Sequence, residues 1–195
     1  MNTLLIFIKN PIKGKAKTRL AKTVGDEEAL RIYKELLRHT RELATKINAR
    51  RQVHYTYFVD YQDEWLEEVF EKHLQTGNDL GNRMGDAFER AFENSSKVVI
   101  IGSDCASLTT TIIEQAFATL DKYDFVIGPA EDGGYYLLGM RAFMPFVFEE
   151  VVWSSSKVLS KTVENIQQHN KTYHFLETLS DIDTEADWKK YGWDN

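Results

Sequence analysis

The stretch from Lys9 to Lys22, KNPIKGKAKTRLAK, contains six basic residues and no acidic one, although the whole chain carries a net charge of −6. It directly follows the apolar run TLLIFI. A loop rich in Lys and Arg suits a polyanion such as a diphosphate, because the cations neutralise its charge and backbone N–H groups can line a cradle. The alternative is a solvated surface loop, but its position after an apolar run favours phosphate binding.

Two common phosphate-binding motifs are absent from this stretch. The pattern GxxxxGK[ST] would require Gly at position 9 and Ser or Thr at position 16, where the chain has Lys9 and Ala16. The dinucleotide fingerprint GxGxxG is absent as well. These residues exclude a P-loop NTPase and leave a phosphate-binding loop of another kind.

Asp104 follows a second apolar run, VVII, in the segment GSDC. A carboxylate just past a buried strand can hold Mg²⁺ or Mn²⁺ against substrate phosphates, because these ions prefer oxygen ligands and need only one or two protein carboxylates. The simpler alternative is a turn-forming or helix-capping Asp. The cationic loop expected at the same edge of the sheet favours the metal.

Two further segments place acidic residues in turn-like surroundings. In EDGGYY, the two glycines after Asp132 permit close backbone approach to a ligand, but the pattern is also typical of an ordinary tight turn. In LSDIDTEADW, Asp181 or Asp183 could contact a metal, but the segment is equally typical of a helix start. Spacing alone favours the structural interpretation of both segments.

Histidine, cysteine and serine chemistry find little support. The five His residues show neither HxxxH nor HxH spacing, which argues against a zinc site. Cys105 has no assignable His partner, so we expect a small buried residue. No GxSxG motif is present to start a serine triad. A single cysteine excludes an internal disulfide and fits a reducing compartment.

The elements that must position these residues alternate between strands and helices. The patterns predict strands at 3–8, 53–59, 98–101, 125–127, 135–140 and 172–175, and helices from 26, over 63–73, around 84–92, over 109–120 and 156–168, and from 184. Such alternation predicts a mostly parallel sheet covered by helices on both faces. Ligands of such sheets bind beyond the carboxyl ends of the strands, where the basic loop and GSDC both lie.

Length and composition limit the possibilities. We expect one domain over residues 1–195, with 43% hydrophobic residues to build its core. The net acidity argues against nucleic-acid binding, because no basic face extends beyond the opening cluster. No run approaches 18 apolar residues, so no membrane span is expected. We therefore expect a soluble, cytoplasmic protein.

Six segments in order carry a resemblance to a known family. KNPIKGKAKTRLA, QTGNDLGNRM, VVIIGSDCASL, IGPAEDGGYYLLG, VVWSSSKVL and LSDIDTEADW resemble the bacterial family called radical-SAM/selenodomain-associated transferase 1, over Leu4 to about Trp188. That group is similar to nucleotide-diphospho-sugar transferases. More distantly, the arrangement looks like the guanylyltransferases of molybdenum-cofactor and phospholactate metabolism.

The resemblance implies a GT-A-type fold, a three-layer α/β/α sandwich with a Rossmann-like sheet, and it implies roles for individual residues. Nucleotide-phosphate binding is implied for Lys9, Pro11, Gly14, Lys17, Thr18 and Arg19, and nucleotide binding for Gln75, Gly81 and Arg83. Binding of Mg²⁺ or Mn²⁺ is implied for Asp104 and Asp183, and Asp181 belongs to the same D-I-D motif as Asp183. The acceptor side is implied for Asp132, Gly133, Gly134, Tyr135, Trp153 and Ser154. Catalytic roles fall to Lys17, Arg19 and Asp132.

One residue departs from the family pattern G-x-D-x-P-x-L, in which Ala106 stands at the proline position. Proline would rigidify the turn after the metal aspartate, so its loss bears on metal affinity. The expected function is a metal-dependent transferase using a nucleotide or nucleotide-sugar and a small-molecule acceptor. The alternatives are nucleotidyl transfer from a nucleoside triphosphate and a non-catalytic nucleotide-binding module. Exposed aromatics around 143–148 suggest an interface in a homo-oligomer.

Overall fold

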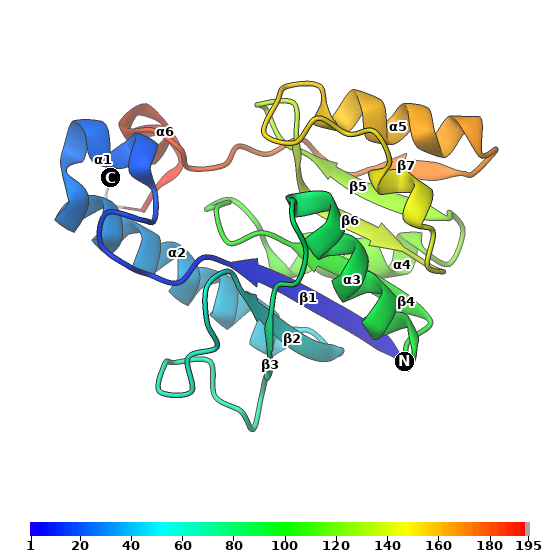
Figure 1. Cartoon of the computed structure of the whole chain (residues 1–195), viewed down its shortest axis with the longest axis horizontal. Coiled ribbons are helices and arrows are strands. Elements are labelled where there is room, and N and C mark those ends of the chain that lie inside the picture. The colour runs from blue at the N-terminus through cyan, green and yellow to red at the C-terminus, as the bar shows by residue number, and fades with distance from the viewer. Residues whose placement is uncertain (194–195) are drawn as a thin grey trace.

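The computed structural model describes residues 1–193 of the chain. Its strands are β1 (Asn2–Ile8), β2 (Arg50–Tyr55), β3 (Glu71–Leu74), β4 (Lys97–Ile101), β5 (Phe125–Pro129), β6 (Tyr135–Met140) and β7 (Tyr173–Phe175). They form one sheet in the order β3-β2-β1-β4-β6-β5-β7 (Figure 1). β6 is antiparallel to β4 and β5, and the other four pairings are parallel. The predicted mostly parallel sheet is confirmed.

Helices cover both faces of this sheet, as predicted (Figure 1). They are α1 (Thr18–Val24), α2 (Asp26–Lys46), α3 (Leu80–Phe92), α4 (Thr110–Thr119), the 3₁₀ helix η1 (Pro145–Phe148), α5 (Val158–Gln168) and α6 (Glu185–Tyr191). One core contains side chains of α2 and α4, such as Ile32 and Ile113. The other contains side chains of α3 and α5, such as Phe88 and Ile166. The result is the predicted three-layer α/β/α sandwich.

The central strand β1 explains why the first apolar run is continuous. Leu4 and Ile6 enter the core on the α2 side, whereas Leu5 enters the core on the α3 side. All three side chains are fully buried. A strand buried on both faces needs apolar residues at every position, so no alternation appears in the sequence.

The helix predicted over 63–73 is wrong. Residues 66–69 include a turn, and the chain then enters β3, where His73 pairs with His54 of β2. The Asp63 carboxylate accepts hydrogen bonds from the Tyr55 hydroxyl at 2.6 Å and from the Lys72 ammonium at 2.7 Å. Because these side-chain bonds tie the segment to β2 and β3, they compete with helical hydrogen bonding.

Two other boundaries differ from prediction. The basic stretch is not a loop throughout, because α1 begins at Thr18. The strand predicted over 53–59 instead occupies Arg50–Tyr55. Beyond it, the Thr56 hydroxyl donates to the Ile8 carbonyl at 2.9 Å, and the chain turns toward the loop that follows β1.

The aromatic residues at 143–148 were expected to be exposed, but they are not. Phe143, Phe146 and Phe148 are half-buried and pack against the core on the α3 side. Their rings contact other rings there, including Phe92 and Phe88. This run therefore contributes to the fold, and self-association stays a prediction without this surface to support it.

Within residues 1–193, none of the helices combines the length and the apolar character needed to cross a membrane.

Candidate nucleotide and acceptor site

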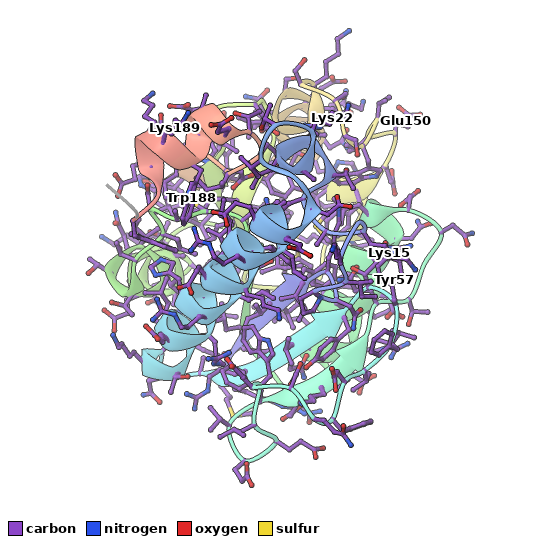
Figure 2. The ribbon with its side chains drawn as sticks, turned by 90° about the vertical axis from the view of Figure 1, so that its left-hand side faces the viewer. Lys15, Lys22, Tyr57, Glu150, Trp188 and Lys189 are labelled. Carbon is purple, nitrogen blue, oxygen red and sulfur yellow. The ribbon has the colours of Figure 1, made fainter. Side chains whose placement is uncertain are left out.

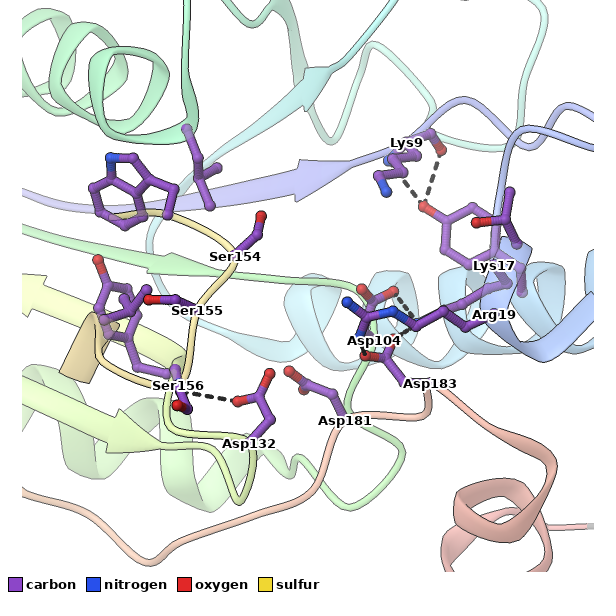
Figure 3. Close-up of a pocket in the computed structure, with 17 residues that line it drawn as sticks. Lys9, Lys17, Arg19, Asp104, Asp132, Ser154, Ser155, Ser156, Asp181 and Asp183 are labelled. Atoms are coloured by element: carbon purple, nitrogen blue, oxygen red, sulfur yellow. Dashed lines mark hydrogen bonds and ion pairs between the residues drawn. The ribbon is translucent and has the colours of Figure 1, made fainter. Parts of the chain in front are cut away.

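A cleft of about 640 Å³ lies at the carboxyl edge of the parallel strands (Figure 3). Segments distant in sequence meet there: the loop after β1 with the start of α1, the loop after β4, the β5–β6 turn, the loop before α5, and residues 181–183. We name two sides of this cleft. The cationic wall consists of Lys9, Lys17, Thr18, Arg19 and Tyr33, and the serine wall consists of Asp132, Gly134, Tyr135, Trp153, Ser154, Ser155, Ser156 and Val158.

The loop after β1 is anchored by a buried amide. Asn10 is only 1% exposed, and its side chain donates to the Phe58 carbonyl at 2.9 Å while accepting from the Tyr57 N–H at 3.0 Å. The loops that follow β1 and β2 are thereby fixed to each other. This anchoring holds the start of the cationic wall in place without using any of its charges.

Lys17 is the central cation of this wall. Its ammonium donates to the Ile182 carbonyl at 2.6 Å and lies 2.9 Å from Asp104 Oδ1 and 3.7 Å from Asp183 Oδ1. The residue has a φ of 51° and a ψ of 45°, in the left-handed region that non-glycine residues seldom adopt. Such strain concentrates at functional sites, where the surrounding structure holds it.

The rest of the cationic wall surrounds Lys17. Arg19 is exposed, and its Nη1 lies 3.0 Å from Asp183 Oδ2. The Tyr33 hydroxyl accepts from the Lys9 N–H at 2.8 Å and donates to the Lys9 carbonyl at 2.9 Å. Burial, assisted by the charge of Asp104, raises the pKa of Tyr33 well above its usual value, so this hydroxyl stays protonated.

Lys13, Lys15 and Lys22 of the basic stretch do not line the cleft. The Lys13 ammonium pairs with Glu27 at 2.6 Å. The Lys15 ammonium lies over the Tyr57 ring, 5.3 Å from its centroid, and the two residues are neighbours in Figure 2. Only part of the basic cluster is therefore available to a ligand in the cleft.

Asp104 and Asp183 offer the oxygen atoms that a divalent cation would need. Their side chains are 43% and 38% exposed, and both contact the same ammonium group. Among residues 1–193, no group of three or more His, Cys, Asp or Glu side chains is placed to hold a metal ion unaided. Two carboxylates completed by phosphate oxygens and water fit the usual coordination of Mg²⁺, so the donor set suits that ion when phosphate is present.

The turn after Asp104 is well supported despite Ala106. The Ile182 N–H donates to the Asp104 carbonyl at 2.8 Å, and Ala106 itself is buried. Nearby, burial and the charge of Asp104 raise the pKa of Asp181 to about 7. The hydrogen bond between residues 104 and 182 thus attaches the segment of Asp181 and Asp183 to the loop after β4, although the two residues are 78 positions apart in the sequence.

The serine wall is shaped by close backbone contact. Gly133 has a φ of 89°, and a Cβ atom added to it would lie 2.3 Å from the Ser156 carbonyl oxygen. Only glycine allows the β5–β6 turn to approach the loop before α5 this closely. The Gly134 N–H donates to Asp132 Oδ1 at 2.8 Å, which fixes the carboxylate at the mouth of the cleft.

Trp153 and Ser154 complete this wall. A Cβ atom on Gly81 of α3 would lie 2.6 Å from the Trp153 indole, so the ring packs directly on the helix backbone. Ser154 has a φ of 60°, a second left-handed non-glycine residue at the cleft. Figure 3 shows the Ser154 side chain directed into the cleft, with no hydrogen bond drawn to the other residues shown.

Eleven of the predicted site residues line the cleft: Lys9, Lys17, Thr18, Arg19, Asp104, Asp132, Gly134, Tyr135, Trp153, Ser154 and Asp183. Six do not: Pro11, Gly14, Gln75, Gly81, Arg83 and Gly133. Gly81 and Gly133 act through the close contacts described above. The Gln75 amide donates to the Ile8 and His54 carbonyls at 3.1 and 2.9 Å. Arg83 donates to the Gly77 carbonyl at 3.1 Å.

The sequence interpretation missed several lining residues. Tyr33 lies on the buried stripe of α2, so it belongs to the core as well as to the cleft lining. Ser155 and Ser156 adjoin the predicted Trp153–Ser154 pair, and their type in a run of three serines was the available signal. Leu80 and Val158 line the cleft as well, but nothing in their spacing distinguishes them from core residues.

The fold occurs in several solved structures. A protein of Desulfovibrio desulfuricans G20, described as a candidate nucleotide-diphospho-sugar transferase, matches 94% of this chain and 82% of its own at 33% identity and a TM-score of 0.88. The 4-diphosphocytidyl-2C-methyl-D-erythritol synthase of Anaerococcus prevotii matches over 98% and 94% at 9% identity and a TM-score of 0.63. The inositol-1-phosphate CTP transferase of T. maritima matches over 98% and 94% at 15% identity and 0.61.

These matches confirm the resemblance to nucleotide-diphospho-sugar transferases and the predicted fold class. Among curated proteins, none matches the chain in sequence. A family model described as "Uncharacterized protein conserved in bacteria (DUF2064)" matches residues 39–155. That range is more than half of the chain, and the chain therefore belongs to the DUF2064 family.

Proposed function

We propose that this protein is a transferase that uses a nucleotide or nucleotide-sugar donor together with Mg²⁺ or Mn²⁺. One observation carries the proposal: Lys17 and Arg19 meet Asp104 and Asp183 at the carboxyl edge of the sheet. Cations and carboxylates placed side by side suit a metal–diphosphate complex, because the cations hold phosphate oxygens while the carboxylates hold the metal. The similarity to the D. desulfuricans protein supports the same class of donor.

Two residues of the cationic wall, and Asp132 of the serine wall, have parts in this proposal. Lys17 and Arg19 neutralise the negative charge on the diphosphate as it leaves. Arg19 presents a planar fork to two phosphate oxygens, whereas Lys17 acts as a point charge. When bound, the metal ion would supply further neutralisation of the leaving group. Asp132, exposed at the other end of the cleft, is placed to accept a hydrogen bond or a proton from the acceptor.

The proposal requires Lys17 to change partners. Its ammonium is shared between Asp104, Asp183 and the Ile182 carbonyl. A diphosphate bound beside it would draw the ammonium toward phosphate oxygens and release the carboxylates for the metal. We therefore expect nucleotide and metal to bind cooperatively.

Nucleotidyl transfer is the second candidate, because one fold relative is named as a CTP transferase and another as the synthase of a diphosphocytidyl compound. In that reaction an acceptor phosphate attacks the α-phosphate of a nucleoside triphosphate, and pyrophosphate leaves. In glycosyl transfer, the nucleoside diphosphate leaves from a nucleotide-sugar. Pyrophosphate release from a nucleoside triphosphate would establish the second candidate, and nucleoside diphosphate release from a nucleotide-sugar would establish the first.

A thermal-shift panel of nucleoside mono-, di- and triphosphates and nucleotide-sugars, each with and without Mn²⁺, tests the proposal. A ligand at 100 to 1,000 times its dissociation constant stabilises the folded state by about 2–4 kcal/mol. We expect a Mn²⁺-dependent shift with at least one ligand, which Asp104→Asn abolishes. Asp121→Asn is a matched control, since Asp121 pairs with Lys97 at the opposite end of β4. The absence of any shift would overturn the proposal.

A further inference from the structure

The charges that line the cleft are divided between its two ends. Of the 17 lining residues, all within residues 1–193, the only lysines and arginines are Lys9, Lys17 and Arg19. Figure 3 shows these three together at one end of the cleft, away from Ser154–Ser156. The serine wall itself carries one charge, the carboxylate of Asp132, with the Asp181 carboxylate beside it in the same view.

The lysines nearest in sequence to the serine wall do not reverse this polarity. Lys157 follows Ser156 directly, but it is exposed and does not line the cleft. Lys161, one turn further along α5, lies 3.1 Å from Glu164 and 3.6 Å from Glu150. A phosphate group on the serine wall would meet Asp132 without a lining cation to neutralise it, and unpaired like charges at a binding surface are strongly unfavourable.

The serine wall offers an apolar face and hydroxyl partners instead. Trp153 packs one part of its indole on Gly81 and remains half-exposed toward the cleft, which Val158 and Tyr135 also line. Aromatic faces of this kind stack on apolar surfaces of ligands. Around it, Ser154 and Ser156 are exposed, and they can donate or accept hydrogen bonds.

Asp132 is oriented to contact such a ligand. Its Oδ1 accepts from the Gly134 N–H at 2.8 Å, and the side chain lines the cleft. The backbone bond fixes the carboxylate group, so Oδ2 is left to accept from a ligand hydroxyl. A fixed carboxylate beside flexible serine hydroxyls is a suitable set of partners for several hydroxyl groups on one molecule.

We propose that the acceptor is an uncharged polyhydroxyl compound, such as a carbohydrate, bound with its apolar face on Trp153 and its hydroxyl groups on Asp132 and the serines. This inference rests on the proposed function. An acceptor hydroxyl oxygen then forms a bond to the anomeric carbon of the donor sugar, and the bond from that carbon to the diphosphate breaks. The nucleoside diphosphate leaves with the electron pair, and Asp132 takes the hydroxyl proton.

Matched pairs of sugars test the acceptor class. Saturation-transfer NMR is measured with glucose, galactose and N-acetylglucosamine against their 6-phosphates. Each sample contains Mg²⁺, in place of the paramagnetic Mn²⁺, and a nucleoside diphosphate chosen from the thermal-shift panel. We expect an uncharged sugar to bind at least about tenfold more tightly than its phosphate. We expect Trp153→Ala to weaken that binding by about tenfold or more and to leave nucleotide affinity within about twofold. Trp193→Ala is the aromatic control, because Trp193 lies beyond the end of α6, packs against His39 and Trp188, and does not line the cleft.

Charge variants sharpen the test. Ser156→Lys places a cation in the serine wall, whereas Val152→Lys adds the same charge at an exposed position that does not line the cleft. We expect only Ser156→Lys to shift binding toward the sugar phosphates, by about tenfold. The inference would be overturned if the unaltered protein bound sugar phosphates more tightly than uncharged sugars. It would also be overturned if sugar-phosphate binding depended on Lys157 and was lost in Lys157→Ala.

Failure of the two proposals is distinguishable. If nucleotides bind but no sugar of either kind binds, the acceptor inference is wrong and the donor proposal stands. If no nucleoside phosphate binds, the proposed function is wrong, and the acceptor inference falls with it.

Discussion

The two walls of the cleft are held in place by different means. In the cationic wall, the functional side chains themselves carry the contacts, since Lys17 bonds to Ile182, Asp104 and Asp183. In the serine wall, close backbone packing of Gly133 against Ser156 sets the shape. A ligand at the cationic wall must therefore replace existing ion pairs, whereas a ligand at the serine wall meets a preformed surface.

This difference explains where charge can be exchanged and where it cannot. Replacing Asp104 by a phosphate as the partner of Lys17 exchanges one anion for another and leaves the carboxylate for a metal. No such exchange is available to Asp132, whose neighbours in the cleft lining, within residues 1–193, include serines, Gly134 and the Asp181 carboxylate but no cation. The walls are thus suited to a charged donor and an uncharged acceptor.

The largest expected effect comes from Asp104→Asn. It removes a proposed metal ligand and leaves Lys17 with a weaker partner, so we expect turnover of the nucleotide or nucleotide-sugar to fall by about 100-fold or more. Steady-state kinetics on the substrate found in the thermal-shift panel measure this loss. Turnover within about threefold of the unaltered protein would show that the cationic wall works without this carboxylate.

Gly133→Ala is expected to disrupt the serine wall alone. The added Cβ would lie 2.3 Å from the Ser156 carbonyl oxygen at a φ of 89°, so we expect a loss of about 1–3 kcal/mol in the free energy of unfolding, with nucleotide affinity retained. Urea denaturation and nucleotide titration measure the two effects.

Gly85→Ala on α3 is the control for that substitution. Its Cβ would make ordinary contact with Phe148 at 3.6 Å, and alanine favours a helix, so stability should be unchanged or slightly higher. If Gly133→Ala lowered nucleotide affinity as well as the free energy of unfolding, the two walls would not be independent.

Arg19→Ala tests the exposed edge of the cationic wall. The Arg19 side chain is 68% exposed, so we expect little change in stability but about tenfold weaker nucleotide binding from the loss of a charge-assisted hydrogen bond. Calorimetric titration measures the affinity, with Arg38→Ala on the outer side of α2 as the matched control. Equal affinities in the two variants would remove Arg19 from the site.

The last prediction concerns acid stability and the strands that support the cationic wall. Burial, with the charges of His73 and Arg90, lowers the pKa of His54 to about 3. Its contribution to stability is present above its unfolded pKa near 6.5 and is lost as pH falls toward 3, at up to about 1.4 kcal/mol per pH unit.

His54→Phe keeps an aromatic ring against Phe7 and His73 and removes this titration. Chemical denaturation from pH 7 to pH 4 should give a shallower loss of stability in the variant, whatever its stability at pH 7. Parallel pH profiles would show that His54 does not control acid sensitivity.

The buried strands and the edge that carries the site could be predicted from sequence. β6 begins and ends at the predicted residues, because its apolar run is bounded by the glycine turn and by Arg141. β3 could not be predicted, since its sequence EKHL is polar and its stability depends on partners elsewhere. Glu71, for example, accepts from Arg50 of β2 at 2.7 Å.

Part of the candidate site could be predicted from sequence, and the rest depends on contacts between distant residues, as β3 does. Residue types in the basic loop and in GSDC indicated phosphate and metal chemistry. The contact of Lys17 with Ile182 joins residues 165 positions apart, and no spacing rule could reveal it. Gly81 was predicted to bind nucleotide, yet its observed role is to admit the Trp153 ring, which depends on a helix and a loop meeting in the fold.

Anomalous diffraction from crystals grown with Mn²⁺ and a nucleoside diphosphate tests the central claim most directly. The account predicts a manganese peak within bonding distance of the Asp104 and Asp183 carboxylates, with the Lys17 ammonium moved onto a phosphate oxygen. A diphosphate bound along Ser154–Ser156, or manganese held by Asp132 with Lys17 still paired to Asp104, would contradict it.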